Sequence, residues 1–264
     1  MQKQLSKSVD NMWEARPPTY EDHMQKPLII ANWKCNPSTR EQAEHLFGTI
    51  KRETKNINGV KIVICPPFVW LPSLNGLSLG AQDCFWEKDG AYTGEVSPKM
   101  LKDLGWCDYV ILGHSERRKY LKETDEMINK KIKAALKSDL TPILCIENIS
   151  QLKKRTKDLL RKEQKKLIIA YEPVFAIGTG KPCTPEKAKE MKTAIKKIID
   201  KDIPIIYGGS VNSQNATDYI KMAGFQGLLV GGASLDSEEF IKLAKNVARA
   251  CPVVELRSLR DCVQ

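Results

Sequence analysis

The sequence lacks the features of a membrane-spanning or secreted protein. None of its apolar runs approaches the ~18 residues that a membrane-spanning helix needs. The N-terminal stretch has no apolar core of the kind found in secretory signals. The eight cysteines form no Cys-x-x-Cys pair, which argues against a zinc or redox motif and is typical of a reducing compartment. We therefore expect a cytoplasmic protein that binds no metal and has no membrane partner.

Sequence features of nucleotide and nucleic-acid binding are also missing. The chain contains neither Gly-x-Gly-x-x-Gly nor a Walker A loop. The formal net charge of +10 would suit an anionic ligand, but the lysines are spread over many segments. The basic segment 153–166 has no aromatic residue to stack on bases and contains Asp158 and Glu163. We interpret this segment as a solvated helix face and expect no nucleic-acid partner.

A regular alternation of short apolar runs and longer amphipathic stretches begins at residue 28. Nearly every residue in most of the runs is apolar, which predicts strands buried on both faces, as in a parallel sheet. The expected strands are residues 28–32, 60–65, 77–82, 109–113, 141–146, 167–171, 204–208 and 227–231. Between the strands, apolar residues recur at spacings of three and four, which predicts helices. The clearest helical patterns are residues 39–55, 123–137, 184–198 and 236–250.

Eight strand–helix pairs in succession predict an α/β protein with a closed (β/α)₈ barrel as its single domain, over residues 27–250. The alternative is an open doubly wound sheet, which differs in strand order, a property that the sequence does not reveal. Residues 1–26 are polar, of mixed charge and interrupted by Pro17-Pro18, so we interpret them as a poorly ordered extension. Residues 251–264 form a second tail in which we find no motif.

Chemically active side chains follow several of the expected strands. In such barrels, catalytic groups lie where strands end and the next loops begin. The strand ends carry Asn32 and Lys34, then His114 and Glu116, and then Glu172. Each side chain alone has a simpler interpretation, as a surface charge, a structural histidine or a loop charge. Their shared position at one rim of the barrel indicates a catalytic site.

Glycine pairs follow the last two expected strands. Gly208-Gly209 precedes Ser210, and Gly231-Gly232 follows the eighth strand. Backbone N–H groups approach a phosphate closely where no Cβ intrudes, and (β/α)₈ barrels often bind phosphate at this place. Tight turns would equally require glycine at either position. The sequence alone leaves a phosphate site and tight turns as alternatives.

Five motifs in this order resemble the triosephosphate isomerase family. They are NWKCN, GHSERR, AYEPVFAIGTGK, YGGSV and LVGGASL, with GAQD and TGEVSP also similar to that family. The resemblance runs from about residue 28 to residue 250. It implies a TIM barrel that interconverts dihydroxyacetone phosphate and glyceraldehyde 3-phosphate by proton transfer through an enediol(ate). It implies no metal and no organic cofactor.

The resemblance also assigns roles to the residues at the strand ends. Glu172 matches the family's catalytic base, and His114 matches the electrophile that polarises the carbonyl group. A helix starting directly after His114 would favour its neutral imidazole. Lys34 matches the cation that attracts phosphate and oxyanion, and Asn32 matches a residue that hydrogen-bonds a substrate oxygen. Glu116 matches a carboxylate that the family pairs with this lysine.

The segment after Glu172 resembles the family's mobile lid. The resemblance implies a first hinge at Pro173, Val174 and Phe175, a lid over residues 176–180, and a second hinge at Lys181, Pro182 and Cys183. Glycine in the lid allows backbone angles closed to other residues, so that a lid N–H can cap the phosphate. The implied phosphate contacts are Gly178, Ser210, Gly231 and Gly232.

Residues 82–98 resemble the long loop that, in this family, inserts into a neighbouring subunit. Thr93 would then reach Asn32 and Lys34 of the partner subunit. A long excursion of this kind is uncommon unless it is functional or packed. We therefore expect an obligate homo-oligomer, most simply a two-fold dimer, with a tetramer as the alternative.

The chain departs from the family pattern in a few places. The usual glycine after Ile146 is absent, residues 148–166 are fewer than the family norm, and Phe175 replaces a hinge tryptophan. None of these changes removes a catalytic group. Two other functions remain: a different phosphosugar enzyme on the same barrel, or a non-catalytic barrel kept as a binding protein. The complete set of acid–base residues argues against both.

Overall fold

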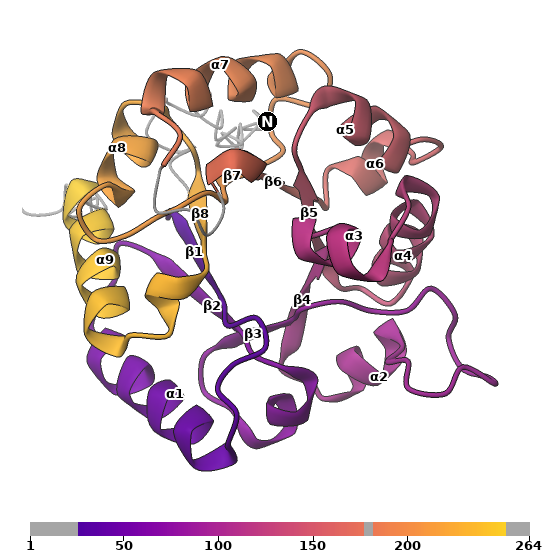
Figure 1. The fold of residues 1–264 in the computed structure, drawn as a ribbon, viewed down its shortest axis with the longest axis horizontal. Coiled ribbons are helices and arrows are strands. Elements are labelled where there is room, and N and C mark those ends of the chain that lie inside the picture. Colours follow the sequence, from indigo (N-terminus) through magenta and orange to yellow (C-terminus); the bar gives the residue numbers. More distant parts are fainter. Residues whose placement is uncertain (1–25, 177–181, 252–264) are drawn as a thin grey trace, which may run out of the picture.

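The computed structural model describes residues 26–176 and 182–251, in which parallel strands close into a barrel (Figure 1). Each strand pairs with the next along the chain, and β8 pairs with β1 in the register Leu28↔Gly227. This closure confirms the (β/α)₈ barrel and excludes the open sheet. The strands are β1 (Leu28–Asn32), β2 (Lys61–Cys65), β3 (Ser78–Ala81), β4 (Cys107–Leu112), β5 (Thr141–Ile146), β6 (Ile168–Tyr171), β7 (Ile205–Tyr207) and β8 (Gly227–Val230). Of the two predicted extensions, only Lys26 and Cys251 are among the described residues.

An outer ring of helices surrounds the barrel (Figure 1). The α-helices are α1 (Arg40–Thr54), α2 (Pro98–Asp103), α3 (Ser115–Leu121), α4 (Asp125–Lys137), α5 (Ile149–Arg155), α6 (Arg161–Gln164), α7 (Pro185–Lys196), α8 (Ala216–Lys221) and α9 (Ser237–Ala250). The 3₁₀ helices are η2 (Phe68–Ser73), η3 (Val174–Ala176) and η4 (Gly232–Ser234). Side-chain oxygens of Thr39, Thr124 and Thr184 cap α1, α4 and α7 by accepting a backbone N–H of the first turn. None of the described helices has the length and apolar content needed to cross a membrane.

The strands are apolar on both faces because each face is buried against a different partner. An inner cluster consists only of strand residues, whereas an outer cluster joins strand residues to helix residues. In β1, Leu28 and Ile30 belong to the inner cluster, and Ile29 and Ala31 belong to the outer one. Side chains alternate along a strand, so the next inward-facing residue is Asn32, at the carboxyl end of the barrel.

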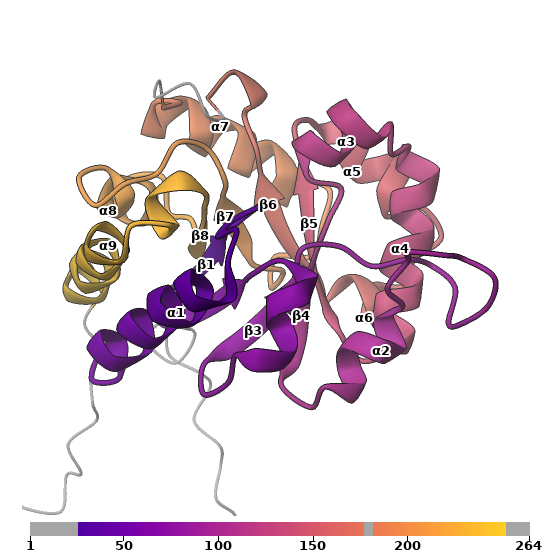
Figure 2. The same cartoon turned by 60° about the horizontal axis from the view of Figure 1, so that its bottom comes forward.

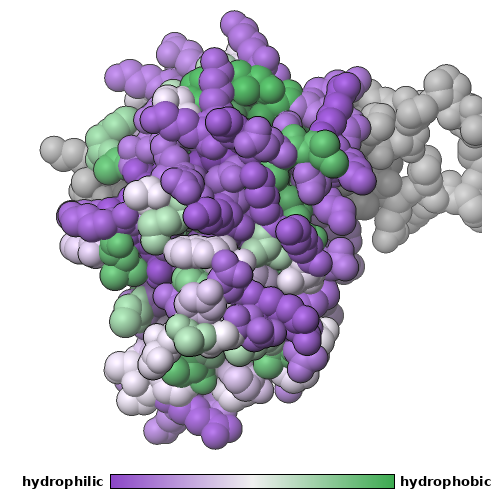
Figure 3. Space-filling model, turned by 90° about the vertical axis from the view of Figure 1, so that its right-hand side faces the viewer, coloured by the Kyte–Doolittle hydropathy of each residue, from purple (hydrophilic) through white to green (hydrophobic). Residues whose placement is uncertain are grey.

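The segment after β5 forms only short helices, as its reduced length predicts. α5 has seven residues and α6 has four. The side of the molecule that carries α3 to α6 is mostly hydrophilic (Figure 3). Most charged side chains of residues 153–166 lie on this solvated surface, but Arg155 is fully buried. The sequence interpretation of this segment is therefore wrong for Arg155.

The loop between β3 and α2 projects from the barrel (Figures 1 and 2). Its base is closed by a hydrogen bond from the Phe85 N–H to the carbonyl oxygen of Val96, 2.8 Å long. All residues from 87 to 95, including Thr93, are exposed. The tip of the loop thus has little contact with its own barrel.

Candidate active site

A cavity of about 280 Å³ opens at the carboxyl ends of the strands. Loops that follow five different strands contribute to its wall, and Lys34, His114 and Glu172 all line it. These three side chains come from distant parts of the sequence, as the analysis of the strand ends predicts. The complete lining is Asn32, Lys34, His114, Glu172, Pro182, Gly208, Gly209, Ser210, Val211, Asn212, Asn215, Leu229, Gly231, Gly232 and Ala233.

Glu172 is a fully buried carboxylate directly after β6. Its backbone N–H donates to the carbonyl oxygen of Ile146 at 2.8 Å. Its Oε2 accepts a hydrogen bond from the Ser115 N–H at 3.2 Å, at the start of α3. Its Oε1 lies 3.2 Å from His114 Nε2 but makes no hydrogen bond to any described residue. A buried carboxylate oxygen without a hydrogen bond is costly, and such groups occur at functional sites.

The thiol of Cys145, on the neighbouring strand β5, interacts with the Glu172 carboxylate. Burial raises the pKa of Cys145 well above its usual value, and the negative charge of Glu172 adds to this effect. The thiol therefore stays protonated beside the carboxylate. The sequence analysis assigned no site role to this cysteine, because thiols are common in apolar strands.

His114 caps the N-terminus of α3, and this contact decides which tautomer a neutral ring adopts. The Glu116 N–H donates to His114 Nδ1 at 3.3 Å. Because Nδ1 accepts, a neutral ring carries its proton on Nε2, the atom that lies beside Glu172. The helix terminus thus presents an N–H donor to the cavity.

Lys34 has a backbone angle φ of 54°, in the left-handed region that side chains other than glycine rarely adopt. The contacts around it hold this conformation. Its N–H donates to Asn32 Oδ1 at 3.0 Å, and its ammonium group pairs with Glu116 Oε1 at 2.6 Å. Gln82 Nε2 donates to the carbonyl oxygens of Lys34 and Cys65 at 2.8 and 2.9 Å. The sequence analysis assigned no role to Gln82, although the motif GAQD, which contains it, resembles the family.

The loops after β7 and β8 supply the polar floor of the cavity. A Cβ built on Gly232 would meet no atom within 4 Å, so the space beside this backbone is open to a ligand. Asn215 fixes the β7–α8 loop: its Nδ2 donates to the Ser210 carbonyl oxygen at 3.2 Å, and its Oδ1 accepts the Asn212 N–H at 3.0 Å. Neither asparagine was predicted. The polar run VNSQN after the glycines was the available signal.

The predicted first hinge lies at the edge of the site. Pro173 is buried, and η3 follows it with Val174 46% and Phe175 64% exposed. Two apolar side chains are therefore held out toward solvent directly after Glu172. Such exposure sets this segment apart from the buried strand before it.

The predicted second hinge connects to the core of the barrel. Pro182 lines the cavity, and Cys183 is buried, with its N–H donating to the Tyr207 hydroxyl at 3.3 Å. Residues 177–181, which include the predicted phosphate contact Gly178 and the hinge residue Lys181, lie outside the described residues.

A larger groove of about 790 Å³ lies between the β3–α2 loop, α2 and α4. Six lysines line this groove, but it shares no lining residue with the smaller cavity and contains no histidine. The smaller cavity, with its carboxylate, imidazole and ammonium groups, is the better candidate for catalysis. No group of three or more His, Cys, Asp or Glu side chains among the described residues is arranged to hold a metal ion.

The family model for triosephosphate isomerase matches residues 27–247. A triosephosphate isomerase of Endomicrobium trichonymphae is 43% identical over 249 residues, which cover 84% of this chain and 99% of the relative. The corresponding enzyme of Dictyoglomus turgidum is 42% identical over 251 residues, with 84% and 100% covered. That of Alkaliphilus oremlandii is 42% identical over 246 residues, with 83% and 98% covered. The chain therefore belongs to the triosephosphate isomerase family.

Proposed function

We propose that Glu172, His114 and Lys34 perform the isomerisation of triose phosphates by this family member. The single observation that carries the proposal is the meeting of a buried carboxylate and an imidazole N–H, with Glu172 Oε1 3.2 Å from His114 Nε2, in a cavity that Lys34 also lines. Carboxylate and imidazole side chains are common general bases and acids, so this pair can move a proton between two adjacent carbons.

In the proposed reaction, Glu172 removes a proton from the carbon next to the carbonyl group of dihydroxyacetone phosphate. The electron pair of that C–H bond forms the C=C bond of an enediolate, and negative charge develops on the former carbonyl oxygen. His114 Nε2–H and the Lys34 ammonium group stabilise this charge. Proton exchange between the two oxygens and return of the proton from Glu172 to the neighbouring carbon yield glyceraldehyde 3-phosphate.

The phosphate group would bind at the floor of the cavity, away from the reacting carbons. Ser210, Gly231 and Gly232 line the cavity there, where their backbone N–H groups would bind the phosphate, and the open space beside Gly232 supports this assignment. Asn32 would hold a substrate oxygen, and Glu116 would keep Lys34 in place through their 2.6 Å ion pair. No cofactor takes part in this scheme.

The lid mechanism is also a proposal. Glu172 Oε2 accepts a hydrogen bond from Ser115, so the carboxylate must leave this contact to reach a substrate carbon. Closure of the segment between Pro173 and Cys183, including Gly178, would move Glu172 and keep water from the enediolate, which would otherwise lose phosphate. Val174, Phe175, Lys181 and Pro182 would take up the backbone change.

The decisive test replaces the proposed base. Glu172→Gln keeps the shape of the side chain but cannot accept the proton, so kcat should fall by about 10³-fold or more while Tm changes little. A coupled assay with glyceraldehyde 3-phosphate measures the rate, and thermal unfolding measures Tm. Glu190→Gln, at an exposed position on α7, is the matched control and should retain full activity. An unchanged kcat in Glu172→Gln would overturn the role of Glu172.

We further propose that the protein works as a homo-oligomer in the cytoplasm, most simply as a dimer. The exposed loop tip with Thr93 supports an oligomer, because such a surface is available to a second copy of the chain. The cysteines of the described residues are all free, which supports a reducing compartment.

A further inference from the structure

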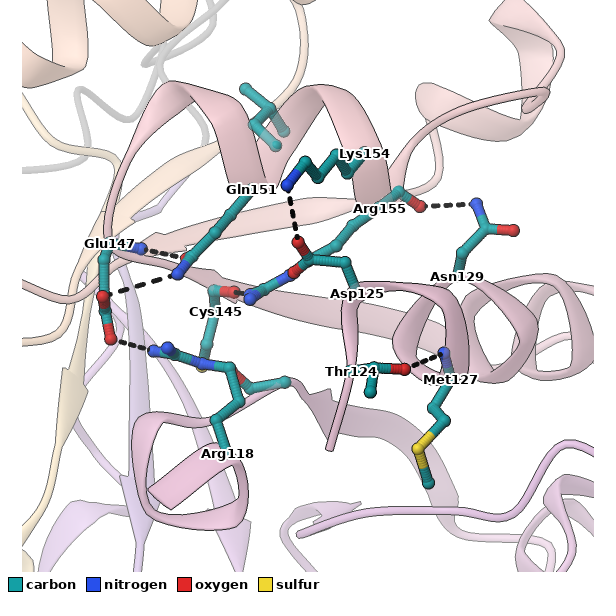
Figure 4. A network of polar contacts seen from close by, with 12 residues as sticks. Arg118, Thr124, Asp125, Met127, Asn129, Cys145, Glu147, Gln151, Lys154 and Arg155 are labelled. Atoms are coloured by element: carbon teal, nitrogen blue, oxygen red, sulfur yellow. Dashed lines mark hydrogen bonds and ion pairs between the residues drawn. The ribbon is translucent and has the colours of Figure 1, made fainter. Parts of the chain in front are cut away.

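Arg155 is a charged residue in the protein interior, although most of the basic segment 153–166 around it is exposed to solvent. Its exposed fraction is 0%, whereas the adjacent Lys154 is exposed. Its Nε donates to Asp125 Oδ1 at 2.7 Å, and its Nη1 donates to the carbonyl oxygen of Cys145 at 2.6 Å (Figure 4). Nη2 is buried and has no hydrogen-bond partner among the described residues. A buried guanidinium group with an unpaired donor is costly, so its retention requires a reason.

Side chains of helix α4 bind both the guanidinium group and the carbonyl oxygen of Arg155. Asp125, in its first turn, binds the guanidinium group, and Asn129, one turn later, donates from Nδ2 to the Arg155 carbonyl oxygen at 2.7 Å (Figure 4). Asn129 Nδ2 also donates to the carbonyl oxygen of Lys157 at 2.9 Å, which satisfies the end of α5. Both the position and the direction of the Arg155 side chain are therefore fixed from α4.

From this position, Arg155 reaches the strand that supports Glu172. It binds the carbonyl oxygen of Cys145. The next carbonyl oxygen along β5, that of Ile146, accepts the backbone N–H of Glu172 at 2.8 Å. The Cys145 side chain itself interacts with the Glu172 carboxylate. Arg155 thus binds Cys145, and both Cys145 and the adjacent Ile146 contact Glu172.

Arg155 also touches the turn that presents His114. A Cβ built on Gly113 would lie 3.1 Å from Arg155 Nη1 and 3.0 Å from Ile128 Cδ1, so the guanidinium group packs directly against this residue. Gly113 has φ of 70° and immediately precedes His114. One planar group therefore contacts the carboxyl ends of both β4, which carries His114, and β5, whose Ile146 carbonyl oxygen accepts the Glu172 N–H.

We propose that Arg155 is a positioning residue, which locks the ends of β4 and β5 together and thereby sets His114 opposite Glu172. The inference rests on the roles proposed above for these two residues. Proton transfer is sensitive to such placement, because an error of 1 Å in a reacting group reduces the rate about 10²-fold. The phosphate grip lies on the loops after β7 and β8 and should be unaffected.

The test separates a fall in kcat from a change in KM. In Arg155→Met, which keeps a straight side chain without charge or donors, kcat should fall about 10- to 100-fold, with KM within about twofold of wild type. Arg155→Lys retains a charge but not the planar fork that spans two acceptors, so its kcat should fall about three- to tenfold. Both are measured in the coupled assay at a temperature at which circular dichroism shows a folded protein.

Val247→Ala is the control for a general loss of stability. Val247 is fully buried on α9, next to Ala248, which packs against Gly59 before β2, at the opposite end of the barrel. This variant should lower Tm and leave kcat within about twofold of wild type, since the site is remote. The proposal would be overturned if Val247→Ala and Arg155→Met both lost kcat in the same proportion to their fall in Tm, because the role of Arg155 would then be structural.

Two further outcomes decide the remaining cases. If Arg155→Met does not fold, Arg155→Lys carries the test, and a wild-type kcat in Arg155→Lys would overturn the proposal. Glu172→Gln, assayed in parallel, separates this inference from the proposed mechanism. If Glu172→Gln is inactive and Arg155→Met is fully active, only the positioning role of Arg155 is contradicted. If Glu172→Gln is active, the proposed catalytic roles, on which the inference about Arg155 rests, are contradicted.

Discussion

Glycines at the rim of the cavity differ in what a side chain at each position would meet. A Cβ on Gly208 would lie 3.1 Å from Glu172 Cγ, closer than most Cβ contacts, so the missing side chain leaves room for the carboxylate. A Cβ on Gly232 would meet nothing within 4 Å, so the space beside this backbone is open. The two glycines therefore bear on different parts of the proposed site, Gly208 on the proposed base Glu172 and Gly232 on the proposed phosphate contacts.

Alanine at each position should consequently change a different kinetic constant. Gly208→Ala displaces Glu172 by a few tenths of an ångström and should lower kcat about tenfold, with KM within about twofold of wild type. Gly232→Ala places a methyl group where phosphate would bind, so KM should rise about tenfold while kcat falls less than about threefold. Initial rates in the coupled assay give both constants. The same loss of kcat in both variants would contradict this division of roles.

The position of Asn32, Lys34 and Glu172 beside the cavity was predictable from the sequence, because each follows or ends an apolar strand and the strand ends of such a barrel share one rim. The supporting contacts were not predictable. Gln82 reaches Lys34 from another strand, and its role depends on the pairing of β1 to β3 through β2. Arg155 lies in a segment whose composition indicates solvation, and its burial follows only from the packing of α5 against α4.

Helix α3 has His114 as its N-cap, although serine, threonine, aspartate and asparagine are the usual capping residues. The imidazole is thereby held with Nδ1 toward the helix and Nε2 toward the cavity. In a neutral ring, this contact places the proton on Nε2. A serine, threonine, aspartate or asparagine cap at this position would not place an imidazole beside Glu172.

The β3–α2 loop leads to a prediction about assembly. If its exposed tip docks on a second copy, the protein should sediment with about twice its chain mass of 29.8 kDa. Thr93→Arg introduces a bulky charge at the proposed contact, so it should shift the protein toward monomer and lower kcat about tenfold or more by loosening Asn32 and Lys34 of the partner subunit. Lys88→Arg, exposed on the same loop, is the control and should sediment as wild type. A wild-type monomer with full activity would refute the prediction.

At the scale of the molecule, the alternation of apolar and amphipathic segments was sufficient to predict every strand to within a few residues. Burial on both faces makes the strands continuous apolar runs, which amphipathic helices interrupt. Closure of the sheet into a barrel could not be predicted from this alternation, because it depends on the pairing of β1 with β8, which are far apart in the sequence. The repeat number indicated closure only through the known preference of eight βα units for a barrel.

The buried strand cysteines predict how stability depends on pH. Burial raises the pKa of Cys107 from 9.0 to about 11, and burial also raises the pKa of Cys65 and Cys145 well above the usual value of a thiol. Between pH 9 and pH 11 the unfolded chain therefore loses thiol protons that the folded barrel retains, so the free energy of unfolding falls as pH rises. Each such thiol contributes a slope of about 1.4 kcal/mol per pH unit in this window.

Urea unfolding at pH 8, 9, 10 and 11 would measure this slope. Below pH 9 the thiols are protonated in both states, so their contribution to stability is fully present and constant there. Cys107→Val keeps an apolar side chain of similar size without a titrating group, so its slope between pH 9 and pH 11 should be shallower than that of wild type by about 1.4 kcal/mol per pH unit. Cys35→Val is the control, because Cys35 is exposed, and its slope should match that of wild type. Equal slopes in Cys107→Val and wild type would mean that Cys107 titrates in the folded barrel as it does in the unfolded chain.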